Sequence, residues 1–185
     1  MDHLFYPRHF LLLAGIGALL GLAARLGFST DVSISFALYG ALHASALVLA
    51  LRAGQRWWRN VLFIAMAAAL SVMTLRAGIV GAQVSGPLAG NVALDAVLGF
   101  SAVVGAATYG ILIRLFGIYE LTVKELTVIA GGCLLAAYAA RLTAAHSPYL
   151  GRSWFAVLWW FAFSGGLWYC DQRRRAVIGR SGAVR

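Results

Sequence analysis

Two opposite charges lie within one apolar stretch, LRAGIVGAQVSGPLAGNVALD at residues 75–95. Arg76 precedes the turn at Ser85 and Gly86 by about as many residues as Asp95 follows it. Two antiparallel helices leaving this turn would hold both side chains at a similar depth. A charge at the centre of a membrane helix costs about 2.5–3.5 kcal/mol, and a bidentate pair offsets much of that cost. We therefore predict an Arg76–Asp95 ion pair, either purely structural or part of a polar site for a solute or proton.

A second arginine shares a helix face with two glycines. Gly17, Gly21 and Arg25 are spaced four residues apart, and such positions lie on the same side of a helix. Small residues allow helices in a membrane to approach closely. Gly17 and Gly21 therefore predict a packing or partner face, and Arg25 is a further candidate for an intramembrane polar site.

One histidine, His43, lies within an apolar segment, in LYGALHASAL. A membrane haem commonly needs a pair of axial histidines, but His3, His9 and His146 all lie near segment ends. The two cysteines also lack the C-x-x-C or Cys/His spacing of a metal site. We therefore expect no cofactor or metal, and we interpret His43 as a hydrogen-bonded structural residue or a proton relay.

The segment WFAVLWWFAFSGGLWYC, residues 154–170, is rich in aromatic side chains. Tryptophans are usual at the two membrane interfaces, but Trp159 and Trp160 lie near the middle of this segment. These two rings could pack on neighbouring helices, face lipid or a partner helix, or stack on a planar ligand such as a quinone. We treat them as a candidate packing or partner face.

The sequence GFSAVVGAATYG, residues 99–110, resembles the serine motif of the rhomboid intramembrane proteases. The resemblance covers about a dozen residues and implies that Ser101 is a nucleophile. That family also places a general base, a histidine, in its sixth helix, and nucleophilic catalysis requires such a base. Residues 154–170 contain no histidine. We therefore do not assign the chain to this family, and we interpret Ser101 as a small packing residue.

Six apolar segments are expected to position these residues. They are long and continuous and lack the ten-residue alternation of an outer-membrane barrel, so helices are the better choice. We predict an all-α integral membrane protein whose single transmembrane domain, residues 1–172, is a six-helix bundle, followed by a basic tail at 173–185. The predicted helices are about 10–26, 32–51, 61–82, 88–113, 126–145 and 154–170.

Composition supports this class. Of the 185 residues, 62% are hydrophobic and only 11% are charged, and the mean hydropathy is +0.83. A soluble domain of this size cannot bury so much apolar surface. The net charge of +9 could suggest nucleic acid, but the basic residues lie between apolar segments and at the C-terminus, as membrane topology signals do. We expect lipid, and no nucleic acid, as the partner of these charges.

The basic residues divide unevenly between the two predicted sides of the membrane. Arg25, Arg76, Arg141 and Arg152 fall on one side, and the remaining Lys and Arg residues fall on the other. The positive-inside rule then places both termini in the cytoplasm of a bacterial-type inner membrane. Alternatively, the first segment is a cleaved signal peptide, with Arg8 as its basic region. Its removal would leave five helices and the same C-terminal orientation.

Three functions fit the sequence. The first is a small membrane subunit or accessory protein that binds another membrane protein or itself, since no catalytic motif is evident. The second is a small-solute or ion transporter or channel with a polar site near Arg76 and Asp95. The third is an intramembrane enzyme using Ser101 or His43; we expect that the protein is not an enzyme.

Overall fold

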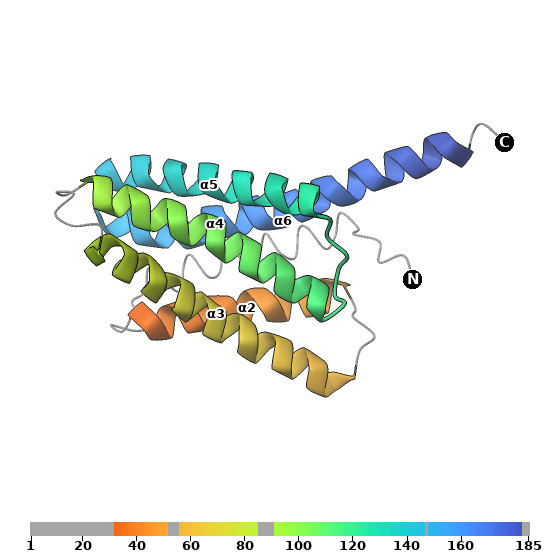
Figure 1. Cartoon of the computed structure of the whole chain (residues 1–185), viewed down its shortest axis with the longest axis horizontal. Coiled ribbons are helices and arrows are strands. Elements are labelled where there is room, and N and C mark those ends of the chain that lie inside the picture. Colours follow the sequence, from red (N-terminus) through yellow and green to blue (C-terminus); the bar gives the residue numbers. More distant parts are fainter. Residues whose placement is uncertain (1–31, 52–55, 85–90, 147, 183–185) are drawn as a thin grey trace.

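The computed structural model describes residues 32–51, 56–84, 91–146 and 148–182. Within these ranges the chain is helical apart from Arg56 and a short connection at 116–122 (Figure 1). The helices are α2 (Val32–Leu51), α3 (Trp57–Val84), α4 (Asn91–Leu115), α5 (Val123–His146) and α6 (Pro148–Gly182). The all-helical prediction is therefore confirmed for the described residues, whereas the predicted helix over 10–26, with Gly17, Gly21 and Arg25, lies outside them.

Three of these helices are long and apolar enough to cross a membrane. The stretches are Trp57–Val80 in α3, Val97–Leu115 in α4 and Val123–Leu142 in α5, and α2 contains a shorter apolar stretch, Phe36–Leu49. Large apolar side chains also point outward: Leu135 is 73% exposed and Met73 is 65% exposed. Such a surface is stable when it contacts lipid, so the chain is a helical membrane protein.

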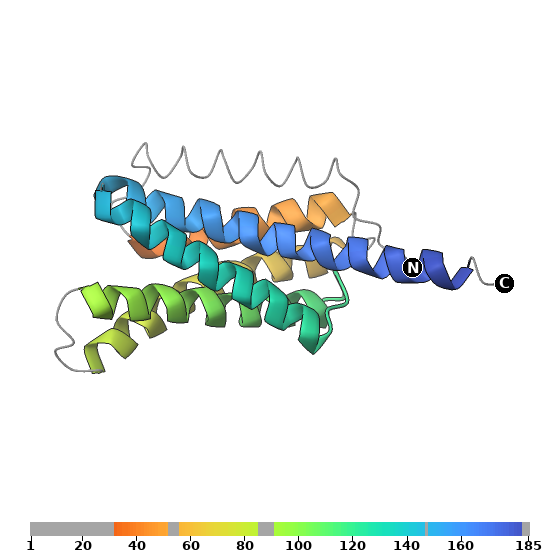
Figure 2. The same cartoon turned by 90° about the horizontal axis from the view of Figure 1, so that it is seen from above.

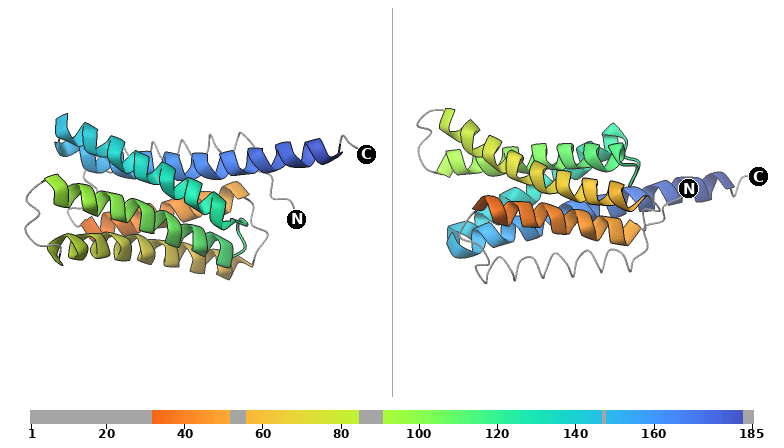
Figure 3. Two further views of the ribbon diagram at one scale, coloured as in Figure 1. Left: turned by 45° about the horizontal axis from the view of Figure 1, so that its top comes forward. Right: turned by 90° about the horizontal axis from the view of Figure 1, so that it is seen from below.

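Each helix packs against the next one in the sequence, in an up-and-down order (Figures 2 and 3). Close approach depends on small residues. An added Cβ on Gly40 of α2 would lie 2.5 Å from the carbonyl oxygen of Ala67 on α3. The backbones of α2 and α3 therefore touch where Gly40 faces Ala67, as membrane helices do at small residues.

The connection between α4 and α5 has well-defined stop and start signals. Gly117 has a φ of 65°, its N–H bonds to the Arg114 carbonyl at 3.0 Å, and the Ile118 N–H bonds to the Ile113 carbonyl at 3.0 Å. This is a Schellman motif, in which glycine adopts the left-handed conformation that ends a helix. At the start of α5, the Thr122 N–H donates to Glu125 at 2.8 Å and the Glu125 N–H donates to Thr122 Oγ1 at 3.3 Å, which forms a capping box.

The observed helices extend beyond the predicted bounds, most clearly at the start of α3 and at both ends of α6. Residues 57–60, predicted as part of a basic loop, form the first turn of α3. The last helix, predicted over 154–170, begins at Pro148 and continues to Gly182, so much of the predicted basic tail is helical and projects past the end of the bundle (Figure 1). Arginine and tryptophan are tolerated in a helix at the membrane interface, so hydropathy alone places the starts of α3 and α6 too late and the end of α6 too early.

Candidate functional site

A cavity lies inside the bundle between α2, α3, α4 and α6. The volume open to the centre of a water molecule is about 70 Å³, which is enough for a few waters or a small ring, since one water needs about 10–15 Å³ on this measure. Its wall combines aromatic rings with hydroxyl groups. The lining residues are Phe36, Tyr39, His43, Leu70, Ser71, Thr74, Leu75, Ser101, Gly105, Thr108, Tyr109, Phe155 and Trp159.

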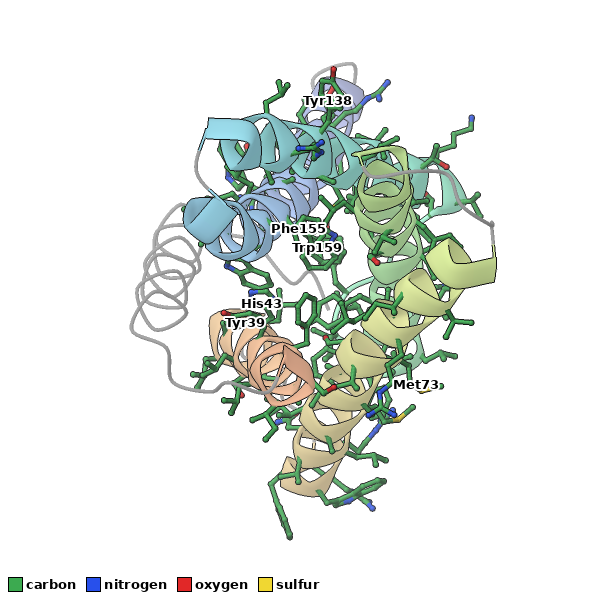
Figure 4. All side chains as sticks on the ribbon, turned by 90° about the vertical axis from the view of Figure 1, so that its left-hand side faces the viewer. Tyr39, His43, Met73, Tyr138, Phe155 and Trp159 are labelled. Atoms are coloured by element: carbon green, nitrogen blue, oxygen red, sulfur yellow. The ribbon has the colours of Figure 1, made fainter. Side chains whose placement is uncertain are left out.

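His43, on the wall of this cavity, connects α2 to α6 through contacts with two tryptophans. Its ring stacks on Trp160, with centroids 3.9 Å apart and planes 8° apart, and its centroid lies 6.1 Å from that of Trp159. Figure 4 shows Tyr39 and His43 on α2 facing Phe155 and Trp159 on α6, whereas Met73 and Tyr138 point away from the bundle. Stacking on a flat indole fixes the plane of the imidazole, so His43 has a defined orientation at the cavity wall.

The two tryptophans lie inside the bundle. Trp160 is completely buried, and the Trp159 indole N–H donates to the Ala102 carbonyl of α4 at 3.1 Å. Trp159 also stacks on Phe163 at 5.2 Å, and Tyr109 meets the same Phe163 edge-on at 5.2 Å. The packing role predicted for Trp159 and Trp160 therefore agrees with their position better than the partner-face role, which needs an outward side chain.

Three buried polar atoms at the cavity have no hydrogen-bond partner within the described part of the protein. They are His43 Nε2, Ser101 Oγ and the Tyr109 hydroxyl. Buried polar groups are nearly always satisfied by protein, water or ligand. An apolar cavity with three unmet polar atoms therefore has the hydrogen-bonding capacity of a binding site.

Three further hydroxyl groups on the wall donate their protons to backbone carbonyls and can only accept a hydrogen bond from a molecule in the cavity. Ser71 Oγ donates to the Ala67 carbonyl at 2.9 Å, Thr74 Oγ1 to Leu70 at 2.8 Å and Thr108 Oγ1 to Val104 at 2.8 Å. Each proton is thus used within its own helix, while the oxygen keeps a lone pair. The wall therefore offers acceptor oxygens on α3 and α4, and groups able to donate at Ser101 and Tyr109.

Ser101 and His43 line the same cavity, although the sequence places them 58 positions apart. Both Ser101 Oγ and His43 Nε2 lack a hydrogen-bond partner among the described residues, so the two atoms are not bonded to each other. An activated serine needs a hydrogen bond to its general base. Ser101 and His43 therefore do not form the hydrogen-bonded pair of an activated serine in this structure.

Arg76 is exposed on α3, and the side chain of Asp95 lies outside the described part of the chain. The register of α3 against α4 determines how deep in the bundle the backbones of Arg76 and Asp95 lie relative to each other. An added Cβ on Gly78 would meet Val97 and Ser101, so Arg76 lies about level with Ser101. Asp95 precedes Ser101 by six residues and its backbone is then about 9 Å nearer the α3–α4 connection, at 1.5 Å per residue. The equal depth expected from the turn is not observed for the two backbones, and the ion pair itself stays a prediction.

Sequence reasoning selected His43 but missed most of the cavity wall. The missed residues Gly105, Thr108 and Tyr109 follow Ser101 at helical intervals of four, seven and eight residues, and such positions share one helix face. This stripe of small and polar residues on α4 is the signal that could have identified the wall. Tyr39, one turn before His43 on α2, belongs to the same cavity.

A second polar cluster lies where α4, α5 and α6 meet. Arg174 Nε donates to Glu125 Oε1 at 2.6 Å, and the guanidinium lies 5.2 Å from the centre of the Tyr119 ring. The hydrogen bond that Arg174 donates to Glu125 raises the pKa of Arg174, and burial raises the pKa of the Tyr119 phenol above its usual range. Arg174 is therefore a fixed cation held over a neutral ring, which ties α6 to the start of α5.

Comparison of the chain with protein-family models, with curated proteins and with the solved structures gives no match. The cavity and the polar cluster are therefore the features of the chain that bear on its function.

Proposed function

We propose that the protein binds a small, neutral, planar molecule in the cavity around His43, as a carrier or transporter of small solutes does. The observation that supports this proposal most directly is the group of three unpartnered polar atoms, on His43, Ser101 and Tyr109, within an otherwise aromatic wall. Pockets of this composition, mostly apolar with a few converging polar groups, are typical of small-molecule sites.

The wall also restricts the chemistry of the ligand. None of the thirteen lining residues in the described part of the chain is Asp, Glu, Lys or Arg, so a charged solute would lose its hydration without gaining a counter-ion from them. Flat aromatic side chains favour a ring that can stack, and the mixed donors and acceptors favour carbonyl or hydroxyl groups on that ring. A quinone or phenol-type ring meets these requirements.

The setting of the site is part of the proposal. We propose six transmembrane helices in a bacterial-type inner membrane, with both termini cytoplasmic. The helix order supports this, because the ends of α2 and α4, the starts of α3 and α5 and the late part of α6 lie at one end of the bundle (Figure 1). That end holds Arg56, Arg59, Arg114, Lys124, Arg173, Arg174 and Arg175, which is the pattern of a cytoplasmic face.

Ligand binding can be tested with 1,4-benzoquinone and hydroquinone as probes and benzoate as a charged control. We expect saturable stabilisation of the detergent-solubilised protein by a neutral ring and none by benzoate. His43→Phe is the informative variant, because it keeps a ring to stack on Trp160 and removes the polar nitrogen. It should weaken binding by about 2- to 10-fold, the range of one net hydrogen bond. Equal affinity in His43→Phe and wild type would exclude His43 from the site.

An accessory subunit is the second candidate, and the length of α6 favours it. The helix continues to Gly182 and leaves the bundle (Figure 1), so it presents a surface that no other described helix covers. If this helix binds a partner, a chain truncated after Ala176 should lose a second membrane protein that the full chain retains in mild detergent. A full-length protein that purifies as a stable monomer would count against this function.

A further inference from the structure

A basic groove lies between the start of α5 and the late part of α6, at the end of the bundle opposite the α3–α4 connection. Its volume is about 450 Å³, and it is lined by Thr122, Lys124, Glu125, Val128, Tyr169, Cys170, Arg173 and Arg174. Lys124, Arg173 and Arg174 are cationic, whereas Glu125 is the single carboxylate among these residues. The groove therefore has a positive charge.

The ion pair inside the groove determines which cations are available. Glu125 bonds to Arg174 through both carboxylate oxygens, so these two charges largely satisfy each other. Lys124 and Arg173 are both exposed. In the described part of the chain neither side chain forms a salt bridge. Their charges are therefore available to an anion from outside the protein.

The groove is also amphipathic along the helix axes. Tyr169, 52% exposed, and Val128, 48% exposed, lie one turn farther into the bundle than Arg173 and Lys124 respectively. Exposed aromatic residues mark the same end of the bundle, since Trp57 and Trp58 begin α3. Aromatic residues concentrate at the level of lipid headgroups. A molecule in the groove would thus place an anionic group against Lys124 and Arg173 and an apolar chain along Val128 and Tyr169.

We propose that this groove binds the phosphate headgroup of an anionic phospholipid, with one acyl chain lying along the outer face of α5 and α6. Basic pockets between membrane helices on the cytoplasmic side bind such headgroups. A free phosphate offers the same charge without the acyl chain. Its binding would not use Val128 and Tyr169, which are lipid-accessible side chains of the same groove.

The test compares the thermal stability of the full chain in detergent with phosphatidylglycerol, phosphatidylcholine or inorganic phosphate added. We expect phosphatidylglycerol to raise the Tm in a saturable manner, while the other two have little effect. The double variant Lys124→Gln/Arg173→Gln should bind phosphatidylglycerol at least about tenfold more weakly, since each nearby basic residue contributes substantially to lipid attraction. Its Tm without lipid should stay close to that of the wild type, because both side chains are exposed.

A matched variant separates the groove from general charge attraction. Arg56→Gln/Arg59→Gln removes two positive charges from the same end of the protein but outside the groove, and it should keep nearly full affinity. Glu125→Gln removes the groove's carboxylate and should bind phosphatidylglycerol at least as well as the wild type. If both double variants lost the same affinity for phosphatidylglycerol, the groove would not be a specific lipid site. Protection by inorganic phosphate as strong as by lipid would overturn the lipid as its ligand.

Discussion

At the scale of single residues, the cavity combines ring packing with unmet hydrogen bonds. His43 stacks on Trp160, yet its Nε2 atom, Ser101 Oγ and the Tyr109 hydroxyl find no partner among the described residues. A buried polar group without a partner destabilises a protein by about 1–3 kcal/mol. The ligand-free protein should therefore have a lower free energy of unfolding than the protein with a ligand bound, or than variants in which these polar groups are replaced by apolar ones.

Removing one of these polar atoms should therefore have opposite effects on the stability of the protein and on its affinity for a ligand. Tyr109→Phe and Ser101→Ala each remove one unpartnered polar atom with little change in shape. We expect the ligand-free Tm of each variant to be unchanged or higher, because a desolvated polar group is lost. Affinity for a neutral ring should fall by about 2- to 10-fold. Thermal unfolding with and without hydroquinone measures both, and a large loss of ligand-free stability would show that these atoms are satisfied.

At the scale of helices, glycines and caps determine how the elements meet. Gly40 allows α2 to touch α3, Gly117 ends α4, and the Thr122–Glu125 capping box begins α5. The late part of α6 is then joined to that box through Arg174. Glu125 therefore takes part both in the cap of α5 and in the contact between α5 and α6, at the end of the bundle that holds most of the basic residues.

Gly40→Ala should strongly destabilise the α2–α3 contact. The added Cβ would lie 2.3 Å from Ser71 Oγ and 2.5 Å from the Ala67 carbonyl oxygen, and the backbone atom cannot rotate away. We expect a loss of about 1–3 kcal/mol, the usual cost of overpacking. Gly131→Ala is the matched control, because its Cβ would meet nothing within 4 Å. Comparable Tm values for the two variants would show that α2 and α3 are not in close contact.

Glu125 has two roles that two substitutions separate. Glu125→Gln retains the capping box, which accepts either Glu or Gln at this position, but loses the charge that bonds to Arg174. We expect a small loss of about 0.5–1 kcal/mol, since the pair is partly exposed to solvent. Glu125→Ala also removes the cap and should cost about 1 kcal/mol more. Chemical denaturation measures the free energy of unfolding of both variants. Equal losses in Glu125→Gln and Glu125→Ala would mean that the capping box contributes nothing to stability.

At the scale of the whole molecule, the described helices form an up-and-down bundle in which α2 and α6 meet through His43 and Trp160. Basic residues gather where α2 ends and α5 begins, whereas Arg76 and Arg141 lie toward the other end of their helices. This distribution defines an orientation in the membrane.

We expect reporter fusions at the two termini to be cytoplasmic, and a reporter inserted between α3 and α4 to lie on the opposite side. The physical reason is the cost of moving many Lys and Arg side chains across the membrane. Paired reporters, one active in the cytoplasm and one active outside it, measure this directly. An external C-terminus would reverse the orientation, and termini on opposite sides would contradict the six-helix count.

The sequence by itself determined the class of the protein and the approximate position of its helices, because length and hydropathy report whether a segment is stable in lipid. It located α2 at 32–51 as observed and identified His43, Trp159 and Trp160. Only the tertiary structure decided which side chains meet. In α2 and α5 apolar residues are spread around the helix, so no amphipathic pattern indicates the inner face of these two helices. Contacts such as His43 on Trp160, and the offset between Arg76 and Asp95, depend on helix rotation and register, which close packing sets.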